Sequence, residues 1–445
     1  MNGDTEKLGV YYKNNNSFDV VINDSVYNVS KTINNSLWHN LYINFDNTGT
    51  NIYIDGNPLL TTALTVYLGG ATTYLGSTTK ESTVSLNGYL QLFAFSNYRY
   101  ISQTSHAIPS TTKIIKNKDS LGRDDSKDVY SNNLHLHKNY TYQFGRLVQE
   151  TMYDGRIKEY TYSLVGNNLI SIKTYNGNVL EDEHYYSYDS YNRLDSESFG
   201  GSLYRYSYDN NGNIISKKKY INDQLVSNDV FEYHQGYKTR LEKYNEKEIK
   251  YENPEAYYPT SIDGNTLVWD VKRLKSYGNI SFEYNEFGQR TKKINGTSVT
   301  EYIYDGNSLI RMIDPSGNIY DFIYDENRYL EGFIYNFSNV YYYERDITGN
   351  IEKIIDNNGS TVVQYKYDAW GKFLENAISS GAPQCNPYLY KGYCYDEETW
   401  LFMMGHRYYS PELCRFIQPD DIEYLDQENI NGLNLYCYCF NNPVM

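Results

Sequence analysis

The sequence predicts an all-β protein, from its tyrosine content, the spacing of its aromatic residues and the chemistry of its turns. Its 445 residues include 53 Tyr, and Tyr, like Thr, Val and Ile, suits a pleated and half-buried surface. Units of the form aromatic-x-Tyr-Asp recur along the chain, and Gly or Asn often follows them. These residues favour the turns between antiparallel strands. We therefore expect strands and hairpins throughout.

Residues 1–105 show strand-length alternations of apolar and polar residues separated by turn residues, a pattern typical of an antiparallel sandwich. The sequences at 38–41 (WHNL), 52–56 (IYIDG) and 88–90 (GYL) resemble the laminin-G and concanavalin A-like family. The resemblance implies an N-terminal jelly-roll sandwich, incomplete here, and many members bind glycans or calcium. Asp46, Asp55 and Asn57 are the candidates for a binding rim for a sugar or Ca²⁺, although turn chemistry explains them as well.

Residues 106–137 contain Pro109 and a polar stretch without periodicity, which predicts a linker. At its end, His135 and His137 lie two residues apart and share one face of a strand. They form a possible metal pair, but ordinary half-exposed strand positions explain them better. We expect no metal and no cofactor in this part of the chain.

Residues 138–375 carry the repeats. The key Tyr occurs at 188 and 208, and again at 284, 304 and 324, with a spacing of 20 in each series. Two aromatics separated by one residue share a strand face. The Asp or Asn that follows opens a turn by binding its own downstream backbone, and Gly supplies a positive φ. Each unit is thus a hairpin that must stack on its neighbours to bury its aromatic face, and its Asp is structural rather than catalytic.

The repeat resembles the Tyr-Asp (YD) repeat of Rhs and wall-associated proteins, toxin-complex shells and teneurins. Residues 376–445 resemble the Rhs repeat-associated core domain, through NPYLYKGYCYDEETWL at 386–401, RYYSPELCRFIQPD at 407–420 and GLNLYCYCFNNP at 432–443. Together these imply a YD-repeat β-sheet spiral or shell capped by the Rhs core. Trp400 and Cys414 stand where the family has Gly, which permits a tight turn.

In that family an intramolecular aspartyl protease releases a C-terminal toxin, and Asp420 matches its carboxylate. Such chemistry needs a second carboxylate close by. Asp421 would face the opposite side of a strand, and Asp426 would lie about 20 Å away along an extended chain. We therefore expect no enzymatic activity. Arg407 and Arg415 are candidates to orient Asp420, but surface pairing with the acidic residues Asp396 or Glu412 is favoured.

The five Cys all lie in the last part of the chain. Cys437 and Cys439 are expected to share the face of a strand as small core residues rather than as metal ligands or a disulfide.

The composition excludes one class of partner. Lys plus Arg number 40 against 55 Asp plus Glu, giving a formal net charge of -15, which repels phosphate, so we expect no nucleic-acid partner. No run of about 18 apolar residues could span a membrane. The first residues lack a signal peptide, which is typical of a cytosolic protein, of a product of a signal-less secretion system or of a fragment.

The principal hypothesis is a structural shell or scaffold of an Rhs-type polymorphic toxin or cell-surface protein, secreted or exposed at the cell surface. The partner would be a C-terminal toxin domain, or a cognate immunity protein, of a fuller-length form. About 300 repeat residues are too few to close a shell, so open sheet edges are expected. The alternative is an adhesin that binds glycans or the cell wall through its N-terminal domain.

Overall fold

The structure is a computed structural model that describes residues 8–62 with short gaps, and residues 113–444 except 132–133, 166, 254–255, 326, 379–385 and 427–431. The chain divides into two compact units, Met1–Thr112 and Lys113–Met445. The described residues are nearly all strand, as predicted, with short 3-10 turns near the C-terminus. They include no helix with the length and hydropathy to cross a membrane.

The first unit contains two three-stranded antiparallel sheets. They are formed by β1 (Leu8–Asn14), β2 (Ser17–Ile22) and β3 (Ser25–Ser30), and by β4 (Leu41–Asp46), β5 (Gly49–Ile54) and β6 (Asn57–Thr62). Val20 and Ile52, on the middle strands, are fully buried. Residues 38–40 and 88–90, which carry much of the lectin-like resemblance, lie outside the described residues, so the jelly-roll assignment stays a prediction.

The second unit begins with a long series of strands. The first of these are β7 (Lys113–Lys118), β8 (Asp124–Ser131), β9 (Leu134–Gln143), β10 (Arg146–Thr151), β11 (Ile157–Tyr162), β12 (Leu169–Asn176), β13 (Val179–Tyr188), β14 (Leu194–Phe199), β15 (Ser202–Tyr208), β16 (Ile214–Ile221), β17 (Gln224–Tyr233), β18 (Leu241–Tyr244) and β19 (Lys247–Tyr251). They continue with β20 (Pro259–Ile262), β21 (Asn265–Asp270), β22 (Arg273–Tyr277), β23 (Ile280–Tyr284), β24 (Arg290–Asn295), β25 (Ser298–Asp305), β26 (Ser308–Ile313), β27 (Ile319–Tyr324), β28 (Leu330–Tyr335), β29 (Asn339–Arg345), β30 (Ile351–Asp356), β31 (Thr361–Tyr367) and β32 (Phe373–Ile378).

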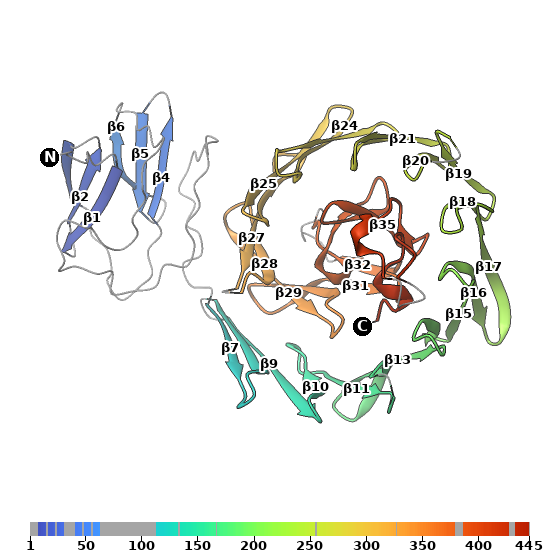
Figure 1. The fold of residues 1–445 in the computed structure, drawn as a ribbon. Coiled ribbons are helices and arrows are strands. Elements are labelled where there is room, and N and C mark those ends of the chain that lie inside the picture. Colours follow the sequence, from blue (N-terminus) through green and yellow to red (C-terminus); the bar gives the residue numbers. More distant parts are fainter. Residues whose placement is uncertain are drawn as a thin grey trace. The chain divides into compact units, whose positions relative to one another are not determined.

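Strands β7 to β32 form one sheet in which sequence neighbours pair antiparallel. The strand order is that of a closed barrel that returns from β32 to β7. Figure 1 shows most of these strands as a ring around the C-terminal residues, with β31 and β32 drawn inside it. The expectation of open edges is therefore wrong for the described strands. Register shifts recur just before the turns, at Ser187/Tyr188, Ser207/Tyr208 and Lys366/Tyr367. Bulges increase bend and twist, which favours closure.

The repeat turns confirm the predicted role of Asp. In each, one carboxylate or amide oxygen accepts hydrogen bonds from the backbone N–H groups two and four residues later. This holds for Asp119, Asp189, Asp209, Asn285, Asp314, Asp325, Asp346, Asp356 and Asp368. Gly at the fourth turn position takes a positive φ in several of them, such as Gly212 and Gly317.

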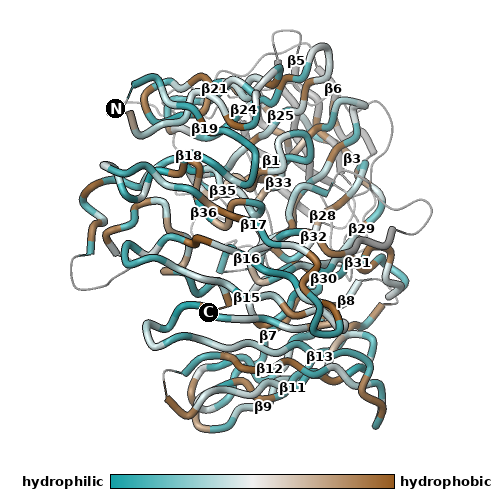
Figure 2. The backbone as a smooth tube through the Cα atoms, turned by 90° about the vertical axis from the view of Figure 1, so that its right-hand side faces the viewer, coloured by the Kyte–Doolittle hydropathy of each residue, from teal (hydrophilic) through white to brown (hydrophobic). Residues whose placement is uncertain are grey.

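The Tyr before the turn joins each repeat to the one before. Its hydroxyl donates to a Leu or Ile carbonyl on the preceding hairpin, for example from Tyr188 to Leu169 at 2.7 Å and from Tyr208 to Leu194 at 2.7 Å. The same contact recurs at Tyr162, Tyr233, Tyr251, Tyr284, Tyr324 and Tyr367. These Tyr rings belong to one continuous core. Hydropathy changes within single strands such as β16 and β17 (Figure 2), because apolar and polar residues both occur along each of them.

The linker expected over 106–137 is wrong from residue 113 onward, where β7, β8 and the start of β9 form part of the sheet. Their polar side chains gave no hydrophobic period because several of them are partly buried in ion pairs with opposite charges. Lys116 lies 2.5 Å from Asp325 and 2.9 Å from Glu331, and Lys127 also pairs with Glu331. A small apolar cluster packs the same strands against β29 and β30.

The C-terminal core lies within the ring (Figure 1). It comprises η1 (Tyr390–Gly392), β33 (Cys394–Asp396), β34 (Leu401–Met404), β35 (Arg407–Ser410), β36 (Arg415–Phe416), η2 (Ile422–Tyr424) and η3 (Cys439–Asn441). Strands β33–β36 form their own antiparallel sheet. Tyr390, Phe402 and Tyr409 are fully buried in the aromatic core that the ring supplies. The segment expected as a cap thus packs inside the ring.

Candidate functional site

The inner face of the ring and the enclosed core form the candidate site. A buried ion pair joins them: Arg290 on β24 donates to both carboxylate oxygens of Asp396 on β33, at 2.5 and 3.0 Å. Lys293 lies 3.4 Å from the same carboxylate. Burial by itself would raise the pKa of Asp396, but the charges of Arg290 and Lys293 outweigh it and hold the pKa below its usual value. Asp396 is therefore an ionised anchor of the core.

A repeat turn supplies the second anchor. The hydroxyl of Tyr390 donates to the carbonyl of Ala369 at 2.8 Å, and that of Tyr409 donates to the carbonyl of Trp370 at 2.7 Å. Gly371 lies directly against the Tyr390 ring: a Cβ added there would lie 2.6 Å from two ring carbons. The turn after β31 and the core are thus packed without space between them.

The last described residues are held against turns of the ring. The Asn442 amide donates to the carbonyl of Asn192 at 3.0 Å and to the side chain of Asn168 at 3.2 Å. The Asn441 amide donates to the carbonyl of Gly212 at 2.7 Å. Asn441 and Asn442 are buried. The Asn-Asn-Pro sequence therefore has a fixed place between the core and strands β12–β16.

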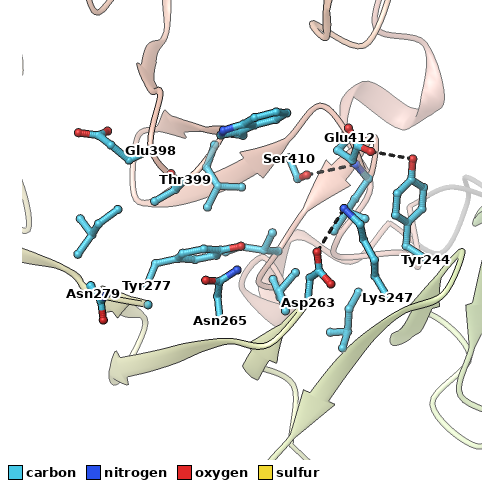
Figure 3. A pocket seen from close by; sticks show the side chains of 18 of the residues that line it. Tyr244, Lys247, Asp263, Asn265, Tyr277, Asn279, Glu398, Thr399, Ser410 and Glu412 are labelled. Carbon is cyan, nitrogen blue, oxygen red and sulfur yellow. Dashed lines mark hydrogen bonds and ion pairs between the residues drawn. The ribbon is translucent and has the colours of Figure 1, made fainter. Parts of the chain in front are cut away.

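A cavity of about 490 Å³ separates part of the core from strands β18–β23. Figure 3 shows Asp263, Asn265 and Tyr277 of the ring on one side, and Thr399, Ser410 and other core residues on the other. Its volume is within the range of small-ligand pockets. Glu412, at one end, accepts from Tyr244 at 3.0 Å and pairs with Lys372 at 2.9 Å. Burial would raise the pKa of Glu412, but its bonds to Lys372 and Tyr244 hold it below the usual value.

Asp420, the residue that matches the family's catalytic carboxylate, lies in a loop and not in a strand. One of its carboxylate oxygens is 2.7 Å from the Arg407 guanidinium, and the other accepts the backbone N–H of Asp421 at 3.0 Å. The carboxylate of Asp421 pairs with Lys272 on the ring. The backbone N–H of Asp426 donates to the carbonyl of Gly432 at 3.0 Å. Asp420 is thus paired with Arg407, and Asp421 with Lys272.

The expected pairing of Arg407 and Arg415 with Asp396 or Glu412 is wrong. Arg407 binds Asp420 instead. Arg415 donates to the carbonyl of Thr239 at 2.6 Å and lies over the Tyr436 ring. Asp396 and Glu412 pair with cations of the ring and its turns. Sequence spacing within the core could not reveal these partners.

Trp400 and Cys414 adopt the conformation for which the family uses Gly. Their φ angles are 61° and 55°, in the left-handed region that strains an L residue by about 1 kcal/mol. The turn between β33 and β34 still forms, with the Trp400 N–H donating to the Asp396 carbonyl at 2.7 Å. The local fold is therefore retained at a cost in strain.

Of the described Cys, Cys394 and Cys414 are buried, Cys437 is partly buried and Cys439 is exposed in η3, so the expected strand pair of core cysteines is wrong. The irregular 3-10 turn replaces the strand. Burial raises the pKa of the Cys394 and Cys437 thiols to about 12, which makes them poor nucleophiles.

His135 and His137 share the outer face of β9, as the sequence predicted, and the structure adds a third residue. Asp128 on β8 lies beside both imidazoles. Sequence reasoning missed Asp128 because its surroundings had been assigned to a linker. The candidate rim of the first unit cannot be assessed in the same way: Asp55 lies outside the described residues, and only the backbone of Asp46 and Asn57 is described.

Comparison with known proteins gives a consistent result. The profile of the teneurin YD-shell family matches residues 125–444. The tRNA nuclease WapA of Bacillus subtilis (strain 168) is 30% identical over 315 residues, which cover 68% of this chain and 11% of WapA. The tRNA3(Ser)-specific nuclease WapA of Bacillus spizizenii is 29% identical over 306 residues, which cover 68% of this chain and 11% of that protein. The chain therefore spans about a tenth of the length of these relatives.

Solved structures share the fold. A crystal structure of TcdB2-TccC3-TEV gives a TM-score of 0.57 at 13% identity, covering 96% of this chain and 25% of that one. A crystal structure of TcdB2-TccC3-Cdc42 gives 0.54 at 15% identity, with the same coverage. At such identity the likeness concerns the fold alone.

Proposed function

This chain belongs to the teneurin YD-shell family, and we propose that it forms the shell and delivery scaffold of a toxin-type protein, enclosing a C-terminal toxin that a fuller-length form carries. The role is structural and not enzymatic. It is exerted outside the producing cell, by a protein that is secreted or held at the cell surface.

One observation carries the proposal: the sheet surrounds the core, and the chain at Asn441 and Asn442 is hydrogen-bonded to turns of the ring. Any segment that follows residue 444 therefore begins beside the core and these turns. The WapA relatives are named as tRNA nucleases, which makes a nuclease a suitable class of enclosed toxin.

The test uses protection from proteolysis. A flexible segment of about 30 residues with a single site for a specific protease is fused after residue 445, and the same segment is fused before residue 1 in a second protein. We expect the C-terminal site to be cut much more slowly than the N-terminal site. Denaturation of the C-terminal fusion should remove the difference, because only a closed shell excludes the protease. Equal cleavage rates in the two native proteins would contradict an enclosing function.

A further inference from the structure

We propose that Asp128, His135 and His137 form a binding site for a divalent transition-metal ion of the zinc type on the outer face of the sheet. The site is separate from the enclosed core and does not depend on the proposed function.

Strand register brings the three residues together. In the β8–β9 pair, Asp128 is directly opposite His137, and Tyr130 is directly opposite His135. Since alternate residues of a strand share a face, Asp128 lies opposite one imidazole and diagonal to the other. Leu136, between the two His, points into the buried cluster on the opposite face. Two imidazoles and one carboxylate thus converge across a single hairpin.

The ligand atoms are already close. His135 Nε2 and His137 Nδ1 lie 2.7 and 2.8 Å from the same oxygen of Asp128, Oδ1, and all three atoms lie within 4.8 Å of one another. Zinc binds imidazole nitrogen and carboxylate oxygen at about 2.0–2.2 Å, so its ligands are separated by up to about 4 Å. The two His side chains are 50% and 44% exposed. A small adjustment of these half-exposed rings is enough to admit an ion between the three atoms.

In the metal-free arrangement, the hydrogen bonds to Asp128 fix which imidazole nitrogens carry a proton. Each imidazole nitrogen that faces Asp128 must carry a proton to donate to the carboxylate. Binding of the ion replaces these two hydrogen bonds by metal–ligand bonds, with each imidazole donating a lone pair and its proton moving to the other ring nitrogen. Solvent reaches the exposed side of both rings, so a water molecule completes the coordination.

Neighbouring side chains hold the ligands in place. The Tyr130 ring stacks on His135 with centroids 4.4 Å apart and an angle of 4° between the planes. The amide of Asn117 on β7 lies 3.3 Å from the second oxygen of Asp128, Oδ2, which leaves Oδ1 for the ion. Such outer contacts orient metal ligands and commonly raise the metal affinity by about 10–100-fold. The ion would join β8 to β9 near the point where the sheet closes.

The test is titration of the full chain with Zn²⁺, followed by calorimetry and by thermal unfolding. We expect one ion per chain and a rise in the midpoint of unfolding with Zn²⁺ concentration. The double variant His135→Gln and His137→Gln should weaken binding by about 100-fold or more and lose the zinc-dependent rise. Asp128→Asn, which keeps the size of the side chain, should weaken it by about 10-fold or more. His406→Gln, at an exposed position on the β34–β35 turn, is the matched control and should bind as the parent does.

Three results would overturn the proposal: no saturable binding to the parent chain, unchanged affinity in the double His variant, or a thiolate-to-metal charge-transfer band when Co²⁺ replaces Zn²⁺. The last would place the ion on a cysteine instead. Circular dichroism of each metal-free variant shows whether it is folded, and because the two His are exposed, the double variant is expected to keep the parent spectrum.

Discussion

Arg290 on the ring and Asp396 in the enclosed core form a two-pronged ion pair, with donor–acceptor distances of 2.5 and 3.0 Å and both side chains 1% exposed. The pair links positions 106 residues apart. The Arg290 guanidinium also donates to the Tyr302 hydroxyl at 3.1 Å and lies over the Tyr302 ring. This contact makes the stability of the ring depend on the presence of the core.

The first prediction concerns the removal of one partner. Asp396→Asn leaves the Arg290 charge buried without its counter-ion and should lower the free energy of unfolding by about 3–5 kcal/mol. The measurement is urea unfolding followed by circular dichroism. Lys292→Met is the control, because Lys292 on the same strand pairs with Glu301 at 3.5 Å in solvent, and exposed pairs contribute about 0–1 kcal/mol. Equal effects of the two variants would show that the buried pair is not an anchor.

The second prediction concerns acid. The folded-state pKa of Asp396 is lowered, so the carboxylate contributes stability that is complete above its unfolded pKa of about 3.9. This contribution is lost as the pH falls below about 4 towards the folded pKa. The stability difference between the parent and Asp396→Asn should therefore stay constant between about pH 7 and pH 5 and shrink below about pH 4. Unfolding free energies of both proteins across this range provide the test, and a difference that grows in acid would contradict the assignment.

The third prediction compares two glycines with similar backbones. Gly371 and Gly317 occupy the same turn position, with φ of 85° and 82°. A Cβ at Gly317 meets nothing within 4 Å, whereas one at Gly371 lies 2.6 Å from the Tyr390 ring. Gly317→Ala should cost about 1 kcal/mol from backbone strain alone. Gly371→Ala should cost about 1–3 kcal/mol more than this, because the added Cβ overpacks the contact with the Tyr390 ring. Similar unfolding midpoints for the two variants would mean that the turn does not pack on the core as described.

The fourth prediction is a gain in stability. Trp400 has a φ of 61° and a side chain that is 64% exposed, so Trp400→Gly removes strain and little packing. It should raise the free energy of unfolding by about 0.5–1 kcal/mol. Cys414→Gly relieves similar strain but removes a buried thiol, so its net gain should be smaller. A thermal unfolding series of the two variants tests this order, and a loss of stability in Trp400→Gly would refute it.

Local chemistry explains why the repeats could be predicted from the sequence. Asp209 binds the N–H groups of Asn211 and Asn213, and Tyr208 bonds to Leu194 of the preceding turn. All these groups lie within one hairpin or its neighbour, so a short sequence pattern specifies them. The continuity of the sheet and the burial of its aromatics follow from repetition of these contacts.

The contacts that escaped prediction join distant parts of the chain. β7 and β8 gave no hydrophobic signal because the partly buried Lys116 and Lys127 pair with Glu331, and such charge pairs have no periodic hydrophobic pattern. Asp396 is paired with Arg290, and Arg407 with Asp420, through positions that only the three-dimensional enclosure of the core sets. Closure of the sheet likewise depends on the accumulated bend of many strands and not on a motif.

The fifth prediction concerns Asp420. Its carboxylate is 31% exposed and is held by Arg407 at 2.7 Å, while the carboxylate of the adjacent Asp421 binds Lys272. Aspartyl proteolysis needs two carboxylates that share a proton. Asp420 and Asp421 instead each bind a separate cation. Mass spectrometry of the purified chain after prolonged incubation in mild acid and at neutral pH should therefore give the full-length mass only. Asp420→Asn should give the same result and change stability by about 1 kcal/mol or less, because the ion pair is partly exposed. A truncated product in the parent that disappears in Asp420→Asn would instead show that Arg407 holds a working catalytic carboxylate.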